Sequence, residues 1–109
     1  MTSLEGITLH VRDIEPSRDF YERVPGVVLV GHRPGEFALF QVGDGLLGLL
    51  QLPRSGFHLE ITTGDRDGMH RRLQAAGIAA IGKPRVKPWG ERTFEVRDPD
   101  GYVLEFQEG

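Results

Sequence analysis

The sequence predicts an α+β fold in which a βαβββ module occurs twice, and three observations support this fold class. Short segments of alternating apolar residues predict strands, and two segments that begin after Asp13 and Asp65 predict helices. The order of these segments repeats after about half the chain. Because each half is too small to be stable alone, we expect both to share one curved, mostly antiparallel sheet with helices outside and a concave cleft inside.

Module one covers residues 4–53 of a single domain that spans residues 1–109. Its predicted elements are a strand at 7–11, a helix at 15–24, and strands at 27–30, 37–42 and 46–52. Asp13 is the expected N-cap of the helix, which Pro25 and Gly26 end. Phe20 and Val24 are expected on the buried side of this helix. Turn-forming residues separate the three later strands, which predicts a meander.

Module two covers residues 56–109 and repeats the same order. Its predicted elements are a strand at 57–63, a helix at 65–76, and strands at 78–81, 92–97 and 102–107. Met69 and Leu73 lie four residues apart and are expected to face the core, while Gly77 is expected to end the helix.

The last two strands are joined by the turn Asp98-Pro99-Asp100-Gly101, in which Pro presets one φ angle and Gly tolerates a positive one. In the second strand Leu104 and Phe106 alternate with Glu105. If the two apolar residues face a core, Glu105 projects from the opposite face of the sheet. A solvated glutamate and a functional carboxylate on the inner face both fit this pattern.

Composition excludes several classes of protein. The 109 residues carry 13 Lys and Arg against 16 Asp and Glu, without basic runs, so we expect no nucleic-acid partner. No apolar run approaches the roughly 20 residues that span a bilayer, and we expect a soluble cytoplasmic protein without a membrane partner. Without cysteine there is no thiolate, so any metal ligands must come from His, Asp, Glu or water.

Several motifs occur in a specific order along nearly the whole chain: Leu9-His10-Val11-Arg12-Asp13, Asp19-Phe20-Tyr21-Glu22, Lys87-Pro88-Trp89-Gly90, and Asp98-Pro99-Asp100-Gly101. In this order they resemble the vicinal-oxygen-chelate superfamily, which includes glyoxalase I, bleomycin-resistance proteins, fosfomycin-resistance enzymes and extradiol dioxygenases. The resemblance is specific for the fold and much weaker for the reaction, because one fold hosts many functions.

In metal-dependent members of the superfamily, ligands come from the first and last strands of each module. The resemblance carries two of these ligand positions onto His58 and Glu105, and it makes Glu105 the candidate catalytic residue. The first-strand histidine position is Gly6 here, and the fourth position falls near Gln51, an amide in place of a carboxylate. A divalent metal site normally needs at least three protein ligands, so this predicted site has too few of them.

The residues expected to line the cleft share the inner face of the predicted sheet. Glu60 alternates with His58, and Thr93 and Glu95 alternate with Phe94. Trp89 is either a structural plug or an aromatic wall for a flat ligand. The full set of predicted ligand-binding residues is His10, Gln51, His58, Glu60, Trp89, Thr93 and Glu95.

Two functions remain open. The first is a small-molecule-binding protein of the bleomycin-resistance or glyoxalase-like type that sequesters an organic ligand, and it is favoured because Gly6 removes a ligand imidazole. The alternative is a metal-dependent lyase, isomerase or dioxygenase. Its cofactor would be a divalent ion such as Ni²⁺, Zn²⁺, Mn²⁺ or Fe²⁺, held by His58 and Glu105. Members of this length commonly pair across their clefts, so the resemblance also implies a homodimer.

Overall fold

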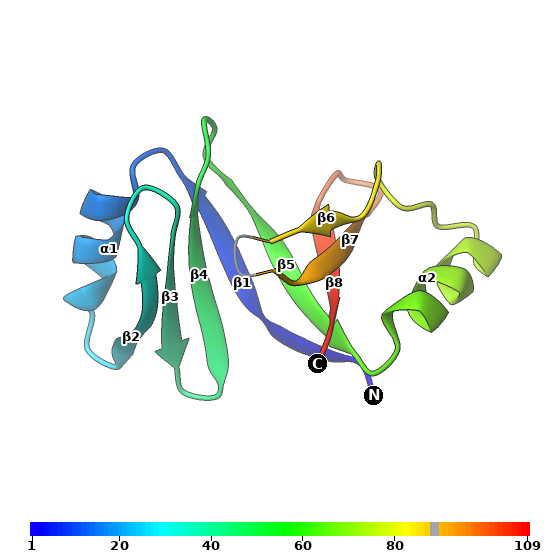
Figure 1. Ribbon diagram of the computed structural model, residues 1–109, viewed down its shortest axis with the longest axis horizontal. Helices are drawn as coiled ribbons and strands as arrows, with labels where there is room; N and C mark the ends of the chain where they lie inside the picture. Colours follow the sequence, from blue (N-terminus) through cyan, green and yellow to red (C-terminus); the bar gives the residue numbers. More distant parts are fainter. Residues whose placement is uncertain (88–89) are drawn as a thin grey trace. The chain divides into compact units, whose positions relative to one another are not determined.

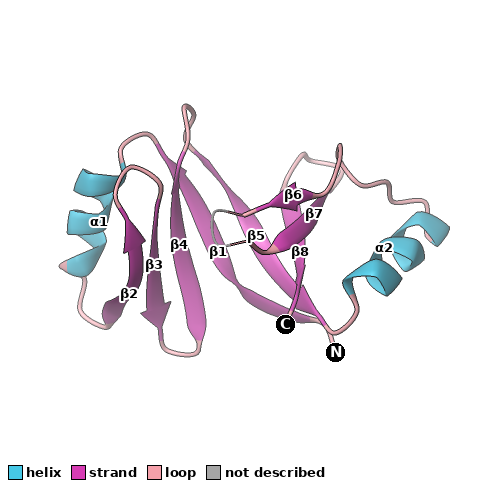
Figure 2. Cartoon of the chain, in the orientation of Figure 1, coloured by secondary structure: helices cyan, strands magenta, loops and turns pink. Residues whose placement is uncertain are grey.

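A computed structural model describes residues 1–87 and 90–109, and the chain forms two compact units (Figure 1). The N-terminal unit is residues 6–57, and the C-terminal unit is residues 58–109 together with residues 1–5. The order βαβββ occurs twice, which confirms the predicted α+β fold class (Figure 2). No helix in the described part of the chain is long and apolar enough to cross a membrane.

The N-terminal unit contains one mixed sheet and one helix. Its elements are β1 (Ser3–Val11), α1 (Ile14–Glu22), β2 (Val27–Arg33), β3 (Phe37–Val42) and β4 (Gly45–Gln51). The strand order is β2-β3-β4-β1, in which β1 is parallel to β4 and the other pairs are antiparallel. The first residues of β1 belong to the C-terminal unit.

Helix α1 packs against β3 and β4 through Ile14, which is fully buried with Phe40. Asp13 is the N-cap, as predicted, and its side chain accepts a hydrogen bond from the Glu15 amide. The predicted burial of Phe20 is wrong, because its side chain is 53% exposed. Ile14 and Tyr21 are seven residues apart and share the buried side of the helix, and Phe20 lies about 100° away from that stripe. Val24, 37% exposed, lies beyond the helix end.

The C-terminal unit repeats the arrangement. Its elements are β5 (Gly56–Thr63), α2 (Arg66–Ala75), β6 (Arg85–Val86), β7 (Arg92–Arg97) and β8 (Val103–Glu108). The strand order is β5-β8-β7-β6, with β5 parallel to β8 and the other pairs antiparallel. Asp65 caps α2, and its carboxylate accepts a hydrogen bond from the Gly68 amide.

The core of this unit lies on the face of β7 and β8 that α2 covers. Phe94 and Phe106 stack with ring centroids 5.1 Å apart, and Met69 and Leu73 of α2 pack against them, as predicted. Because side chains alternate along a strand, the neighbours of these phenylalanines point to the opposite face. Glu105 therefore lies on the face away from α2.

The predicted strand at residues 78–81 is wrong. In this segment the Ile81 amide donates one hydrogen bond to the Glu95 carbonyl, and Gly82 then turns the chain with φ of +60°. The turn leads the chain away before a ladder of hydrogen bonds can form. Strand β6 begins only at Arg85, where it pairs with Thr93 of β7.

Candidate functional site

Three glutamates form a row across neighbouring strands of the C-terminal unit. Glu60 of β5 is the direct partner of Glu105 of β8, and Glu105 is the direct partner of Glu95 of β7. Their side chains are only 10%, 4% and 11% exposed, respectively. Like charges directly opposite one another destabilise a sheet, so this row needs positively charged partners.

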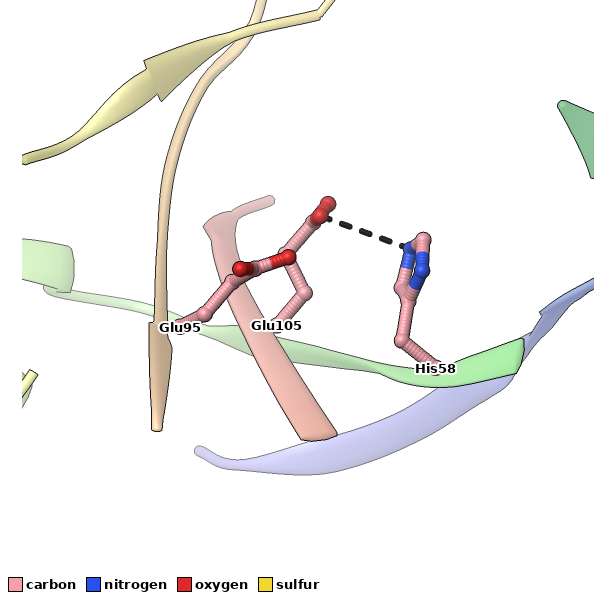
Figure 3. A group of neighbouring side chains, drawn as sticks. All are labelled: His58, Glu95 and Glu105. Atoms are coloured by element: carbon pink, nitrogen blue, oxygen red, sulfur yellow. Dashed lines mark ion pairs between the residues drawn. The ribbon is translucent and has the colours of Figure 1, made fainter. Parts of the chain in front are cut away.

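His58 lies two residues before Glu60 on β5 and shares its face of the strand. Its Nε2 atom lies 2.8 Å from Glu60 Oε2 and 3.4 Å from Glu105 Oε2, and its side chain is 3% exposed. Figure 3 shows the imidazole pointing toward the Glu105 carboxylate, with Glu95 on the other side of Glu105. The imidazole and the carboxylates therefore meet on one face of the sheet.

Lys87, just beyond β6, brings a positive charge to the row. Its Nζ donates to Glu60 Oε2 at 3.0 Å and also contacts Glu105 Oε1, and its side chain is 6% exposed. Arg85 lies at the rim, 3.7 Å from Glu95, with 69% of its side chain exposed. We call His58, Glu60, Lys87, Glu95 and Glu105 the polar cluster.

The surroundings of Glu105 change its acidity. Burial and the neighbouring charge of Glu60 raise the pKa of Glu105 to about 7, and Lys87 and His58 offset part of this effect. A carboxyl group with this pKa can both accept and release a proton near neutral pH. Such perturbed groups are found more often at functional sites than elsewhere.

The sequence matches the profile of the Glyoxalase/Bleomycin resistance protein/Dioxygenase superfamily over residues 3–106. The chain belongs to this superfamily. A search of curated proteins found no match. The predicted membership is thereby confirmed by a match that covers nearly the whole chain.

Several solved structures have the same fold as this chain. The methylmalonyl-CoA epimerase from Mycobacterium tuberculosis is 20% identical, with a TM-score of 0.82 over 96% of this chain and 86% of that one. A superfamily member from Vibrio splendidus 12B01 is 21% identical, with a TM-score of 0.74 and full coverage of both chains. A variant of the Streptomyces coelicolor methylmalonyl-CoA epimerase in complex with 2-nitronate-propionyl-CoA is 19% identical, with a TM-score of 0.82 over 100% and 95%. At these identities the likeness shows the shared fold.

The superfamily's metal chemistry can be tested against the donors present here. His58, Glu95 and Glu105 each offer one ligand atom, and these atoms lie within 4.8 Å of one another. Nitrogen and oxygen donors of this kind suit divalent ions. The Lys87 ammonium group, however, already contacts Glu105. A divalent ion about 4 Å from an ammonium group is repelled by about 8 kcal/mol at an effective dielectric constant of about 20. The set as it stands therefore does not fit a metal.

Two positions of the superfamily's ligand pattern lie in the N-terminal unit and have structural roles there. Gly6 pairs with Leu46, and a Cβ at Gly6 would lie 1.9 Å from the Leu46 carbonyl oxygen, so the backbone leaves no room for a histidine. The Gln51 side-chain oxygen accepts a hydrogen bond from the Ile14 amide at 2.9 Å, in the first turn of α1. His10 lies on β1, half-buried, with its ring beside Gly56.

The two remaining predicted ligand-binding residues are Thr93 and Trp89. Thr93 is fully buried, and within the part of the chain that the structure describes its hydroxyl oxygen has no hydrogen-bond partner. Trp89 lies outside the described residues.

The sequence-based prediction missed Lys87 and Arg85. A signal was available, because these residues are two apart and therefore share one face of an extended segment. Placing the strand at residues 78–81 concealed it. Three glutamates predicted on the inner face of the sheet, with no cation assigned to them, were a second signal.

Proposed function

We propose that this protein binds a small organic molecule at the polar cluster. The burial of Lys87 between Glu60 and Glu105 supports this proposal most directly. Taking charged groups out of water is costly, and apolar side chains of similar volume would stabilise the fold at least as well. A cluster of this kind in a superfamily of ligand-binding folds is therefore best explained by a role in binding.

The charges of the cluster indicate which ligands it would accept. Three carboxylates face two cations when Arg85 is counted with Lys87. Acceptor oxygens are therefore in excess, and a ligand with hydrogen-bond donors or a positive charge would complement them. Glu95 is the natural contact, since it is the least buried carboxylate of the row and pairs with Arg85, which lies at the rim.

Two measurements test this proposal. Native mass spectrometry of tag-free protein should detect a co-purified small molecule, and a thermal-shift screen of small amines and amino sugars should identify ligands. The Glu95→Gln variant should bind any such ligand at least about tenfold more weakly, which corresponds to a loss of about 1.4 kcal/mol in binding free energy. The matched control is Asp44→Asn, at an exposed turn between β3 and β4. Affinities that Glu95→Gln leaves unchanged would place binding elsewhere and refute the proposal.

A second candidate is an isomerase that moves a proton at a carbon next to a carbonyl group. The position of Glu105, between His58 and Lys87, favours it. Glu105 would take the proton and return it, while the Lys87 ammonium group would stabilise the negative oxygen of the enolate between these steps. The raised pKa of Glu105 suits this role. The lyase and dioxygenase forms of the alternative depend on a metal, and the donor set does not favour them.

The methylmalonyl-CoA epimerases among the structural neighbours suggest the first substrate to test. The wild-type protein in D₂O should exchange the hydrogen between the two carbonyl groups of methylmalonyl-CoA, as followed by mass spectrometry, and Glu105→Gln should not. Equal exchange by both proteins would eliminate the isomerase. The homodimer and the cytoplasmic location remain predictions, and sedimentation velocity would test the first.

A further inference from the structure

The charges around the glutamate row suggest how this chain differs from metal-dependent relatives. Glu60, Glu105 and Glu95 lie side by side on three neighbouring strands, and each is at most 11% exposed. Carboxylates packed this closely need a cation nearby. In a metalloprotein of this fold a divalent ion would supply that charge.

Here the cation is part of the chain. Lys87 Nζ donates to Glu60 and also contacts Glu105, so one ammonium group bridges two of the three carboxylates. The Lys87 side chain is as well buried as the carboxylates that it contacts. Arg85, two residues earlier, lies beside the third carboxylate, Glu95. Every member of the row thus has a positively charged side chain within 3.7 Å.

His58 belongs to the same arrangement. Its Nε2 atom lies next to carboxylate oxygens of both Glu60 and Glu105, which accept hydrogen bonds but cannot donate them when ionised. These oxygens hold Nε2 beside the glutamate row, where it is the nitrogen donor that an ion would use once Lys87 is removed.

We propose that the Lys87 ammonium group takes the place of the divalent metal in this protein, and that its removal converts the polar cluster into a metal site. The working form of the protein is then metal-free. This proposal does not depend on the identity of the ligand. A small molecule can bind at the polar cluster whether or not Lys87 replaces a metal. Lys87 can likewise replace a metal whichever ligand the protein binds.

The test compares metal binding by wild type and Lys87→Met, both purified without a histidine tag. Titration calorimetry with ZnCl₂, NiCl₂ and MnCl₂, with elemental analysis of the dialysed proteins, gives affinity and stoichiometry. Lys87→Met should bind one of these ions at a ratio of one per chain, at least about tenfold more tightly than wild type. Lys83→Met is the matched control, since it removes the same charge from an exposed position four residues earlier and should bind like wild type.

Two further variants place the gained site. Lys87→Arg keeps the positive charge and should remain a weak metal binder. Adding His58→Ala to Lys87→Met should abolish the gain, because it removes the only imidazole among the candidate donors in the described part of the chain.

Three results would overturn the proposal: stoichiometric metal in wild type that His58→Ala removes, equal metal affinities of wild type and Lys87→Met, or a gain that survives loss of His58. If Lys87→Met does not fold alone, its thermal unfolding is measured with and without ZnCl₂. A folded state restored by the metal supports the proposal, and a chain that stays unfolded in both conditions contradicts it.

Discussion

The raised pKa of Glu105 predicts an unusual dependence of stability on pH. Its pKa is about 7 in the folded chain and 4.5 as the ordinary value. Between these values the folded state binds more protons than the unfolded state, so the free energy of unfolding falls as pH rises. A difference of about 2.5 pKa units corresponds to about 3 kcal/mol at 1.36 kcal/mol per unit. This cost is absent below pH 4.5 and complete above pH 7.

Glu105→Gln isolates this effect, since an amide resembles the protonated carboxyl group and does not ionise. The variant should match wild type below pH 4.5 and exceed it in stability by about 3 kcal/mol above pH 7. Urea unfolding followed by circular dichroism between pH 4 and 8.5 measures both curves. Asp44→Asn controls for the loss of an exposed carboxylate. A Glu105→Gln variant that is less stable than wild type at pH 8 would show that the contact with Lys87 outweighs burial, and the reasoning would fail.

Two further predictions concern the N-terminal unit. Gln51→Ala should lower the free energy of unfolding by about 1 kcal/mol, because it leaves the Ile14 amide without its acceptor, whereas Gln51→Glu should retain the bond. Gly6→Ala should destabilise the protein by about 2 kcal/mol or more, because its Cβ would meet the Leu46 carbonyl oxygen. Gly31→Ala is the matched control, as its Cβ would meet nothing closer than 3.7 Å. Urea unfolding measures all four variants, and equal costs at Gly6 and Gly31 would contradict the backbone clash.

Features that depend on local pattern were predictable from the sequence. Asp13 and Asp65 cap the helices because their side chains can accept hydrogen bonds from amides in the first turn, and this shows in residue type and spacing. Alternation placed Glu105 opposite Leu104 and Phe106. The exposure of Phe20 could not be predicted from this pattern, because a short helix with several apolar residues can turn more than one side toward the core.

Features that depend on register between strands could not be predicted. Glu60 and Glu105 lie 45 residues apart in the chain and become partners only because β5 and β8 pair in one particular register. A shift of one residue would move every side chain of a strand to the other face. The burial of Lys87 was even harder to predict, because lysine is rarely buried and is usually solvated.

We expect the buried charges of the polar cluster to lower the free energy of unfolding relative to apolar side chains of similar volume. Removing Lys87 alone leaves two buried carboxylates without their shared cation, so Lys87→Met should cost about 3–5 kcal/mol in free energy of unfolding at pH 8. The triple variant Glu60→Leu, Lys87→Met, Glu105→Leu removes the charges together. It should be as stable as wild type or up to about 4 kcal/mol more stable, because apolar groups of similar volume pack without desolvation cost.

Urea unfolding of the single and triple variants separates two explanations of the cluster. If the charges serve mainly to hold the fold together, the triple variant will be less stable than the Lys87→Met single variant. If they are retained for binding, the triple variant will recover the stability that the single variant loses, and it will have lost the ligand. The second outcome is expected, because a buried ion pair rarely stabilises a protein more than the apolar side chains that could replace it.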